Sequence, residues 1–282
     1  MNKMLISQII QKLKEYHKGY GTIDEATTRD KILFGNPDQE CTGIVISCWA
    51  SVDVIKEAIA RNANLIICHE ALFWNHGDHQ EWLQEAQNPT YLEKKKLLEE
   101  HGIVVWRDHD YIHSGIPVDG KWVDGIFYGL AKELGWLDRM LDQEPMGTTV
   151  FDLSDMTVKE AAAHMVDKMN LNGLKILGNP DENAGIARVQ FHVLGDANDM
   201  INEAERLDTN LLICMELIDF TLAEYVRDSA QLGRKRTALT AGHFNTEEPG
   251  MKYCLEYFPQ VIGEDIPMTF VQSGDMYHYL TK

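Results

Sequence analysis

Apolar residues recur along the chain with two spacings, one typical of amphipathic helices and the other of buried strands. Helical spacing near the start predicts a helix over residues 5–16. Short runs of apolar, mostly β-branched residues predict strands at residues 43–48, 64–68 and 102–106. Helical patterns lie between them, at residues 52–61, where Ser51 can cap the first turn, and at residues 91–100. This alternation predicts an α/β fold with a mainly parallel or mixed sheet flanked by helices.

The second half of the chain repeats the pattern of the first. A shift of 146 residues places residues 51–70 over residues 197–216 without a gap, and nine of the twenty aligned positions are identical. A β-rich run precedes each copy, at residues 43–48 and 188–194. Self-similarity of this kind predicts two internally related α/β domains.

The helix predicted at residues 157–171 and the strand predicted at residues 174–178 lead into the second copy. We therefore expect a first domain formed by residues 1–138 plus 245–282 and a second formed by residues 139–244. No Pro-rich or Ser-rich linker separates the halves, which predicts that they pack closely.

Composition narrows the choice of partners and location. Lys and Arg total 26 against 44 Asp and Glu, which gives a formal charge of −18. Such a charge repels phosphate backbones and anionic lipids, so we expect neither a nucleic acid nor a membrane partner. The first residues lack the apolar core of a signal peptide, and five scattered cysteines without a C-x-x-C pair fit reduced thiols. Both features favour a cytoplasmic protein.

Histidines and carboxylates gather at the ends of three apolar runs. His69 and Glu70 directly follow the strand at 64–68, and the strand at 102–106 leads into a segment with His109 and His113. A third group follows the apolar run at 237–241 and contains His243 and Glu247, with Asn245 as a candidate helix cap. Ligands bind at the carboxyl ends of strands in open α/β sheets. Imidazoles and carboxylates without thiolates form the ligand set of a divalent hydrolytic site.

Other interpretations of these residues stay open. A histidine at a strand end is most often a hydrogen-bonded structural residue, so all three groups could be structural, with no metal bound. His69 and Glu70 leave the strand on opposite sides, so each could serve a different ion or one could only pack. His76 and His79 lie in a polar stretch that favours a solvated loop over a lid that contacts substrate. Sequence signatures of a P-loop, a dinucleotide fold and a G-x-S-x-G hydrolase do not occur.

The order of these motifs resembles the NGG-interacting-factor-three-like (Nif-three-like) family, also labelled type 2 GTP cyclohydrolase I homologues. The family motifs His-His-Pro, H-T-N-L-D and G-H-Y-A-T-E correspond here to residues 69–71 (HEA), 109–113 (HDYIH) and 242–247 (GHFNTE). The resemblance extends over nearly the whole chain. It implies two divalent metal ions per chain, held in a cleft between two related α/β domains, and a homo-oligomer such as a hexameric ring.

By position, the resemblance implies five metal ligands: His69, Glu70, His113, His243 and Glu247. Glu247 would bridge the ions, and His109 would stand beside them as the residue that transfers protons. Glu70 replaces a family histidine and His113 replaces a family aspartate, so the net ligand charge is preserved while the preferred metal can change. The ions could be zinc, manganese or iron. A family motif with histidine in the second domain is missing, and residues 214–220 (CMELIDF) take its place.

These expectations describe a metal-dependent hydrolase that acts on a small molecule. Two divalent ions polarise an electrophile and lower the pKa of a bridging water. The family label suggests a purine nucleotide such as GTP as substrate. The alternative is a non-catalytic metal-binding protein with a regulatory or interaction role, for which closed coordination suffices.

Overall fold

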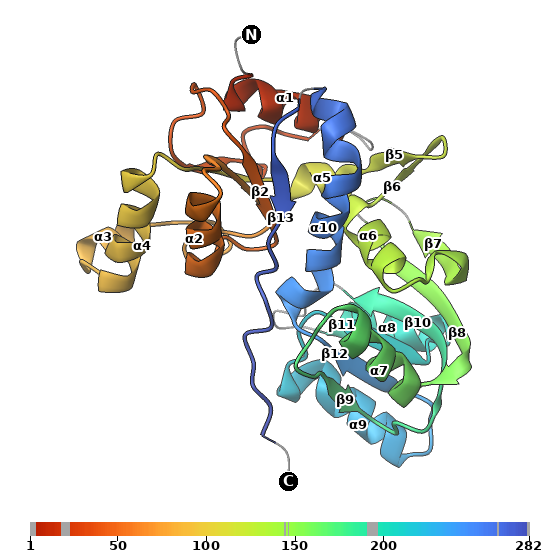
Figure 1. Ribbon diagram of the computed structural model, residues 1–282. Helices are drawn as coiled ribbons and strands as arrows, with labels where there is room; N and C mark the ends of the chain where they lie inside the picture. The colour runs from red at the N-terminus through yellow and green to blue at the C-terminus, as the bar shows by residue number, and fades with distance from the viewer. Residues whose placement is uncertain are drawn as a thin grey trace. The chain divides into compact units, whose positions relative to one another are not determined.

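The computed structural model describes residues 4–17, 23–143, 145, 147–190, 197–263 and 265–280 (Figure 1). The chain divides into two compact units. Unit 1 comprises residues 1–129 and 250–273, and unit 2 comprises residues 130–249 and 274–282. Two helices, α6 (Gly125–Glu133) and α10 (His243–Ile262), run across the boundaries between the units. The domain boundaries predicted after residue 138 and before residue 245 stay a prediction.

Unit 1 contains a five-stranded sheet in the order β1-β4-β3-β2-β13. The strands are β1 (Ile32–Phe34), β2 (Ile44–Ser47), β3 (Leu65–Cys68), β4 (Val104–Arg107) and β13 (Met268–Phe270). All neighbours are parallel except β1, which pairs antiparallel with β4 at the edge. Every residue of β2, β3 and β4 is buried, as expected for central parallel strands covered on both faces.

Five helices lie wholly in unit 1: α1 (Ile6–Tyr16), α2 (Val52–Ala60), α3 (Glu81–Glu85), α4 (Pro89–Glu100) and α5 (Asp110–Ser114). Apolar side chains of α2 and α4 form one core cluster with Val45, Ile66 and Val105 of the sheet. Ser51 accepts a hydrogen bond from the Val54 backbone N–H, which confirms the predicted cap of α2. A hairpin of β5 (Ile116–Val118) and β6 (Lys121–Val123) completes the unit.

Unit 2 contains a six-stranded mixed sheet in the order β7-β8-β10-β11-β12-β9. The strands are β7 (Met140–Gln143), β8 (Thr149–Thr157), β9 (Lys175–Leu177), β10 (Asn183–Gln190), β11 (Leu211–Cys214) and β12 (Thr237–Thr240). The central β10, β11 and β12 are parallel, and the others pair antiparallel. Its helical segments are η1 (Leu137–Arg139), α7 (Val158–Lys168), α8 (Asn198–Arg206), η2 (Asp219–Ala223) and α9 (Glu224–Gln231).

The two sheets share a four-strand motif. The order β1-β4-β3-β2 in unit 1 matches β9-β12-β11-β10 in unit 2, and in both the first strand is the antiparallel edge. The same four residues, Gly-Asn-Pro-Asp, follow each edge strand, at residues 35–38 and 178–181. The predicted pair of related α/β units is therefore visible in strand order as well as in sequence.

In each unit, the Gly-Asn-Pro-Asp turn and the residue after it bind the start of a helix through backbone hydrogen bonds. Pro37 and Gln39 accept hydrogen bonds from the first backbone N–H groups of α1, and Pro180 and Glu182 do so for α7. The leading glycines have φ of +85° and +93°. A Cβ on Gly35 would lie 2.7 Å from the Ile103 carbonyl oxygen, and one on Gly178 would lie 2.8 Å from that of Arg236. Only glycine fits both the angle and the space.

The predicted strands and long helices are confirmed within a few residues of their bounds, and the fold is mixed α/β. The polar stretch expected to be a loop also contains the short helix α3. Asn245 as a helix cap is wrong, because α10 already begins at His243 and the Asn245 side chain donates to the Ala241 carbonyl. Residues 191–194 of the run predicted at 188–194 lie outside the described residues. No helix in the described ranges is both long and apolar enough to cross a membrane.

Replacing either turn glycine by alanine should destabilise its unit. For Gly35→Ala and Gly178→Ala we expect a loss of about 3 kcal/mol in the free energy of unfolding, from left-handed backbone strain plus a clash with a backbone oxygen. Gly102→Ala and Gly233→Ala are matched controls, because these glycines also have positive φ but have open space at the Cβ position. They should lose only about 1 kcal/mol. Equal losses in urea unfolding for both pairs would contradict this explanation.

Candidate metal centre

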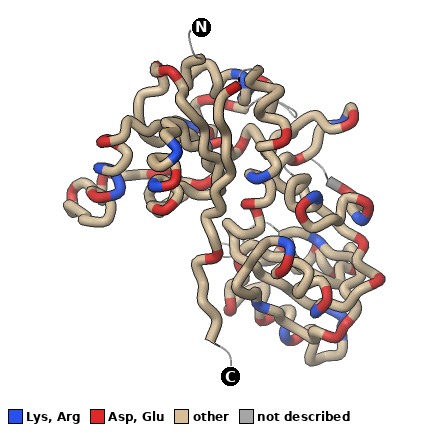
Figure 2. Tube along the Cα trace, viewed as in Figure 1, with Lys and Arg blue, Asp and Glu red and all other residues tan. Residues whose placement is uncertain are grey.

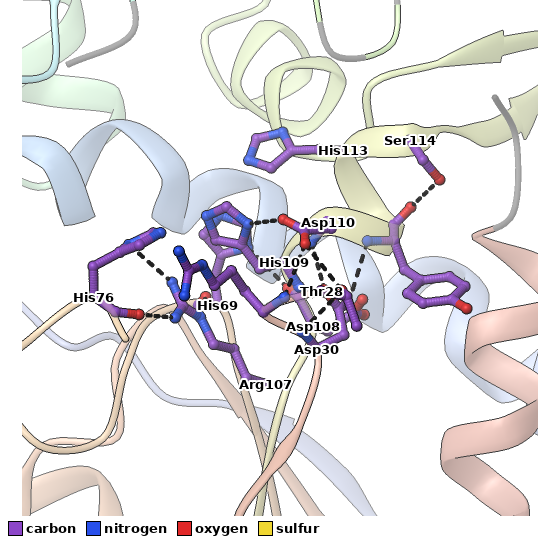
Figure 3. A network of polar contacts seen from close by, with 12 residues as sticks. Thr28, Asp30, His69, His76, Arg107, Asp108, His109, Asp110, His113 and Ser114 are labelled. Carbon is purple, nitrogen blue, oxygen red and sulfur yellow. Dashed lines mark hydrogen bonds and ion pairs between the residues drawn. The ribbon is translucent and has the colours of Figure 1, made fainter. Parts of the chain in front are cut away.

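Three histidines of unit 1 form a compact cluster at the carboxyl ends of two neighbouring strands (Figure 3). His69 directly follows β3, His109 follows β4 by two residues, and His113 lies in the short helix α5. One nitrogen of each ring lies within 4.8 Å of the corresponding nitrogens of the other two. His69 and His113 are buried and His109 is partly buried. His109 and His113 lie 40 and 44 residues after His69 in the sequence, and the parallel pairing of β3 with β4 brings them next to it.

Each ring of the cluster has its Nδ1 atom bonded to an oxygen. The acceptors are the backbone carbonyl of Asp108 for His69 at 2.9 Å, the Asp110 carboxylate for His109 at 2.8 Å and the Asp124 carboxylate for His113 at 2.8 Å. In a neutral imidazole, a proton on Nδ1 leaves the lone pair on Nε2. Histidines that bind metals commonly donate their second N–H to a carboxylate or a backbone carbonyl. The donor set and its supporting contacts therefore fit a divalent ion.

The rings pack against one another in a way that favours their neutral form. His69 and His109 stack with ring centroids 4.5 Å apart and planes 16° apart. Burial and the neighbouring His69 lower the pKa of His109 to about 3. A protonated imidazole cannot bind a metal, so this environment holds His109 in the state that a ligand requires at neutral pH.

Two aspartates fix the segments that carry these rings. Asp30, just before β1, accepts hydrogen bonds from the backbone N–H groups of His109, at 2.9 Å, and Asp110, at 2.6 Å. It thereby caps α5, although burial and the nearby Asp108 raise the pKa of Asp30 to about 7. Asp124 holds His113 through one oxygen, and its other oxygen accepts backbone N–H groups in the first turn of α6. The sequence pattern predicted a role for neither Asp30 nor Asp124.

A further buried contact supports the end of β4. His17 is fully buried, with Nδ1 3.0 Å from an Asp108 carboxylate oxygen and Nε2 2.8 Å from the Tyr257 hydroxyl. Both ring nitrogens are thus engaged within the protein, which fits a structural role for His17. Cys68, at the end of β3, is also buried, and burial raises the pKa of its thiol to about 12. It packs as a thiol and is not available as a thiolate ligand.

Glu70, another predicted metal ligand in unit 1, is buried beside a cation. One of its carboxylate oxygens lies 3.1 Å from a guanidinium nitrogen of Arg107, the last residue of β4. The same arginine donates to the carbonyl of His76, whose ring lies edge-on to His109 with centroids 5.6 Å apart. His76 is exposed, as expected for a polar loop, yet its backbone is tied to the buried end of the sheet.

The remaining predicted ligands lie in unit 2. His243 begins α10, and its Nε2 is 3.2 Å from a carboxylate oxygen of Glu247 one turn later. Its Nδ1 is hydrogen-bonded to the carboxylate of Glu216, two residues beyond β11. Sequence reasoning assigned Glu216 no role, although the internal repeat already aligns it with Glu70. His243 therefore sits between two carboxylates.

Comparison with known proteins agrees with these features. A family model described as Duf34/NIF3 (NGG1p interacting factor 3) matches residues 4–275. The chain belongs to the DUF34/NIF3 family. This confirms the resemblance drawn from the motifs.

Curated relatives of this NIF3 chain carry the name GTP cyclohydrolase 1 type 2 homolog. One from Clostridium acetobutylicum is 23% identical over 228 residues, which cover 78% of this chain and 77% of the relative. One from Staphylococcus aureus strain COL is 22% identical over 238 residues, which cover 83% of this chain but only 58% of the longer relative. Identities at this level leave the activities of these proteins as proposals for this chain.

Solved structures show the same fold. A hypothetical protein of Staphylococcus aureus aligns with a TM-score of 0.69 at 14% identity, covering 99% of this chain and 100% of the other. A Bacillus cereus protein related to NIF3 gives the same TM-score, identity and coverage. The NIF3 fold is thus retained although few side chains are shared.

Asp124→Asn tests whether the carboxylate behind His113 supports metal binding. Asparagine still caps a helix well, so thermal stability should change little. With the single amide oxygen on the N–H groups of α6, the amide NH2 faces His113 and cannot accept the proton on its Nδ1. Zinc affinity should therefore fall about tenfold, as is typical when an outer-shell carboxylate is lost. Competition with a chromophoric chelator measures the affinity, with the exposed Asp152→Asn as control. Unchanged zinc affinity in Asp124→Asn would contradict the assignment.

Proposed function

We propose that this NIF3-family chain is a divalent-metal-dependent hydrolase of a small molecule, with two ions per chain. The observation that carries the proposal is the cluster of His69, His109 and His113, in which every Nδ1 is held by an oxygen. Imidazole donors suit zinc, iron and related ions. When bound, a divalent ion supplies a Lewis acid that polarises an electrophile and lowers the pKa of a bound water.

In this proposal some residues bind the ions and others orient the residues that bind them. Asp110 and Asp124 hold the Nδ1 protons of His109 and His113, which orients both rings. Glu70 adds a carboxylate beside the cluster, with one oxygen within 4.8 Å of a ring nitrogen of His69. His243 and Glu247 hold the second ion, with Glu247 as the bridging ligand that the family resemblance implies. Glu216 keeps the Nδ1 proton of His243 in place.

His109 has two candidate roles. The motif resemblance gives it proton transfer, whereas its position in the cluster and its lowered pKa favour a metal ligand. A proton carrier works best with a pKa near the working pH. We therefore place His109 among the ligands in this proposal.

Partners and location are part of the same proposal. The proposal includes a homo-oligomer, such as a hexameric ring, and a cytoplasmic location. The five buried cysteine thiols support the location. Acidic residues are spread through both units and basic residues are interspersed among them (Figure 2). This distribution supports a small-molecule substrate over nucleic acid or membrane. The name of the curated relatives makes GTP the first substrate to test.

Metal counting on ligand variants tests this function. Protein purified without chelator or affinity metal and loaded with zinc should contain two ions per chain. His113→Ala and His243→Ala should each lose about one ion, since they belong to different clusters. His101→Ala, which removes an exposed histidine next to α4, should keep both. Circular dichroism checks folding of each variant.

The same samples separate the alternatives. His109→Ala should lose an ion if His109 is a ligand, and should keep it but lose turnover if His109 transfers protons. Loaded wild-type protein that hydrolyses nothing in a broad panel that includes GTP would favour the non-catalytic metal-binding protein. A chain that takes up neither zinc, manganese nor iron would overturn the proposal.

A further inference from the structure

Arg107 is a buried cation that joins three segments around the histidine cluster. Its relative exposure is 1%, and its Nε donates to the His69 carbonyl at 2.9 Å. One Nη donates to the His76 carbonyl at 2.8 Å, and the other lies 3.1 Å from a carboxylate oxygen of Glu70. Figure 3 shows the guanidinium beside His76, with dashed lines for its contacts to that residue. The register that pairs Arg107 with Cys68 places it level with the end of β3.

These contacts fix the carboxylate of Glu70. A buried carboxylate stays ionised at acceptable cost only when it is paired, and Arg107 supplies that pairing. The guanidinium is planar and rigid, and two backbone carbonyls hold it on its other edges. It cannot turn without breaking those bonds, so the position of Glu70 is set as well.

The ion pair changes what the centre offers to a cation. Manganese and magnesium draw much of their affinity from carboxylate charge, whereas zinc is well served by neutral imidazoles. Arg107 offsets the charge of Glu70, whereas the neutral imidazoles of the cluster carry no charge for it to offset. Imidazoles therefore contribute a larger share of the affinity for a cation, and the carboxylate contributes a smaller share.

We propose that Arg107 is a positioning residue that makes the centre prefer imidazole-seeking ions such as Zn²⁺ over carboxylate-seeking ions such as Mn²⁺, through its ion pair with Glu70. The inference rests on the proposed metal centre and adds the residue that sets its selectivity. It concerns metal preference, which is measured without any substrate.

The test is the ratio of zinc to manganese affinity of the full chain, measured for each ion by competition with a chromophoric chelator. In Arg107→Gln a bound cation, and no longer a guanidinium, is the partner of the Glu70 carboxylate, and a carboxylate whose charge nothing else offsets favours manganese. We expect the zinc-to-manganese ratio to fall about tenfold, the lower end of the usual effect of an outer-shell substitution. Arg107→Lys keeps the charge but not the planar fork, and its ratio should fall by a smaller factor of about three.

A double-mutant cycle isolates the route through Glu70. Once Glu70→Gln has removed the charge, adding Arg107→Gln should leave the ratio unchanged. His76→Ala is the matched control, because it removes a ring that contacts Arg107 and His109 but keeps both the carbonyl that accepts from Arg107 and the ion pair with Glu70. Its ratio should equal that of the wild type. Circular dichroism verifies folding, and Arg107→Lys replaces Arg107→Gln in the comparison if the latter does not fold.

Two results would overturn the inference while leaving the proposed function intact. One is a wild-type ratio in the Arg107 variant. The other is a fall of equal size with and without the Glu70 charge, which would mean that Arg107 acts through the His69 backbone. A wild-type chain that binds neither ion would overturn the proposed function and this inference together.

Discussion

The hydrogen bond from Nδ1 of each clustered histidine to a protein oxygen determines what the cluster can do. It fixes the proton on one side of the ring and the lone pair on the other, and it sets the ring's orientation. Two of the three acceptors are carboxylates that are themselves anchored. Asp124 also caps α6, and Asp110 lies in the first turn of α5, which Asp30 caps. The contacts that hold local helices together therefore also prepare the rings for a cation.

The internal duplication places a glutamate at the same position in both units, and the residues around it differ. In each unit a glutamate follows the central strand by two residues, as Glu70 after β3 and Glu216 after β11, and each pairs with a basic residue at or beyond the end of the next strand. That residue is Arg107 in unit 1 and His243 in unit 2. The residue before each glutamate differs, histidine in one copy and methionine in the other. The same strand order thus carries an imidazole cluster in unit 1 and a histidine between two carboxylates in unit 2.

The local spacing of apolar residues was sufficient to predict the central strands, the long helices and the position of the histidines at strand ends. It was not sufficient for β1, which has three residues and an exposed first position, so it carries little periodic signal. Contacts between segments far apart in the sequence could not be predicted from local pattern either. Asp30 acts on His109 from 79 residues away, and the Arg107 pairing depends on the register of β4 against β3. Asp124 had a local signal, an aspartate directly before a helix, and Glu216 had one in the repeat.

The most direct test of the histidine cluster as a metal site is anomalous diffraction at the zinc edge from crystals of the zinc-loaded protein. If the three imidazoles hold one ion, an anomalous peak lies about 2.0–2.1 Å from the Nε2 atoms of His69, His109 and His113, the usual zinc–imidazole distance. The Nδ1 contacts to Asp108, Asp110 and Asp124 should be unchanged. A zinc-loaded crystal with no peak between these three rings would contradict it.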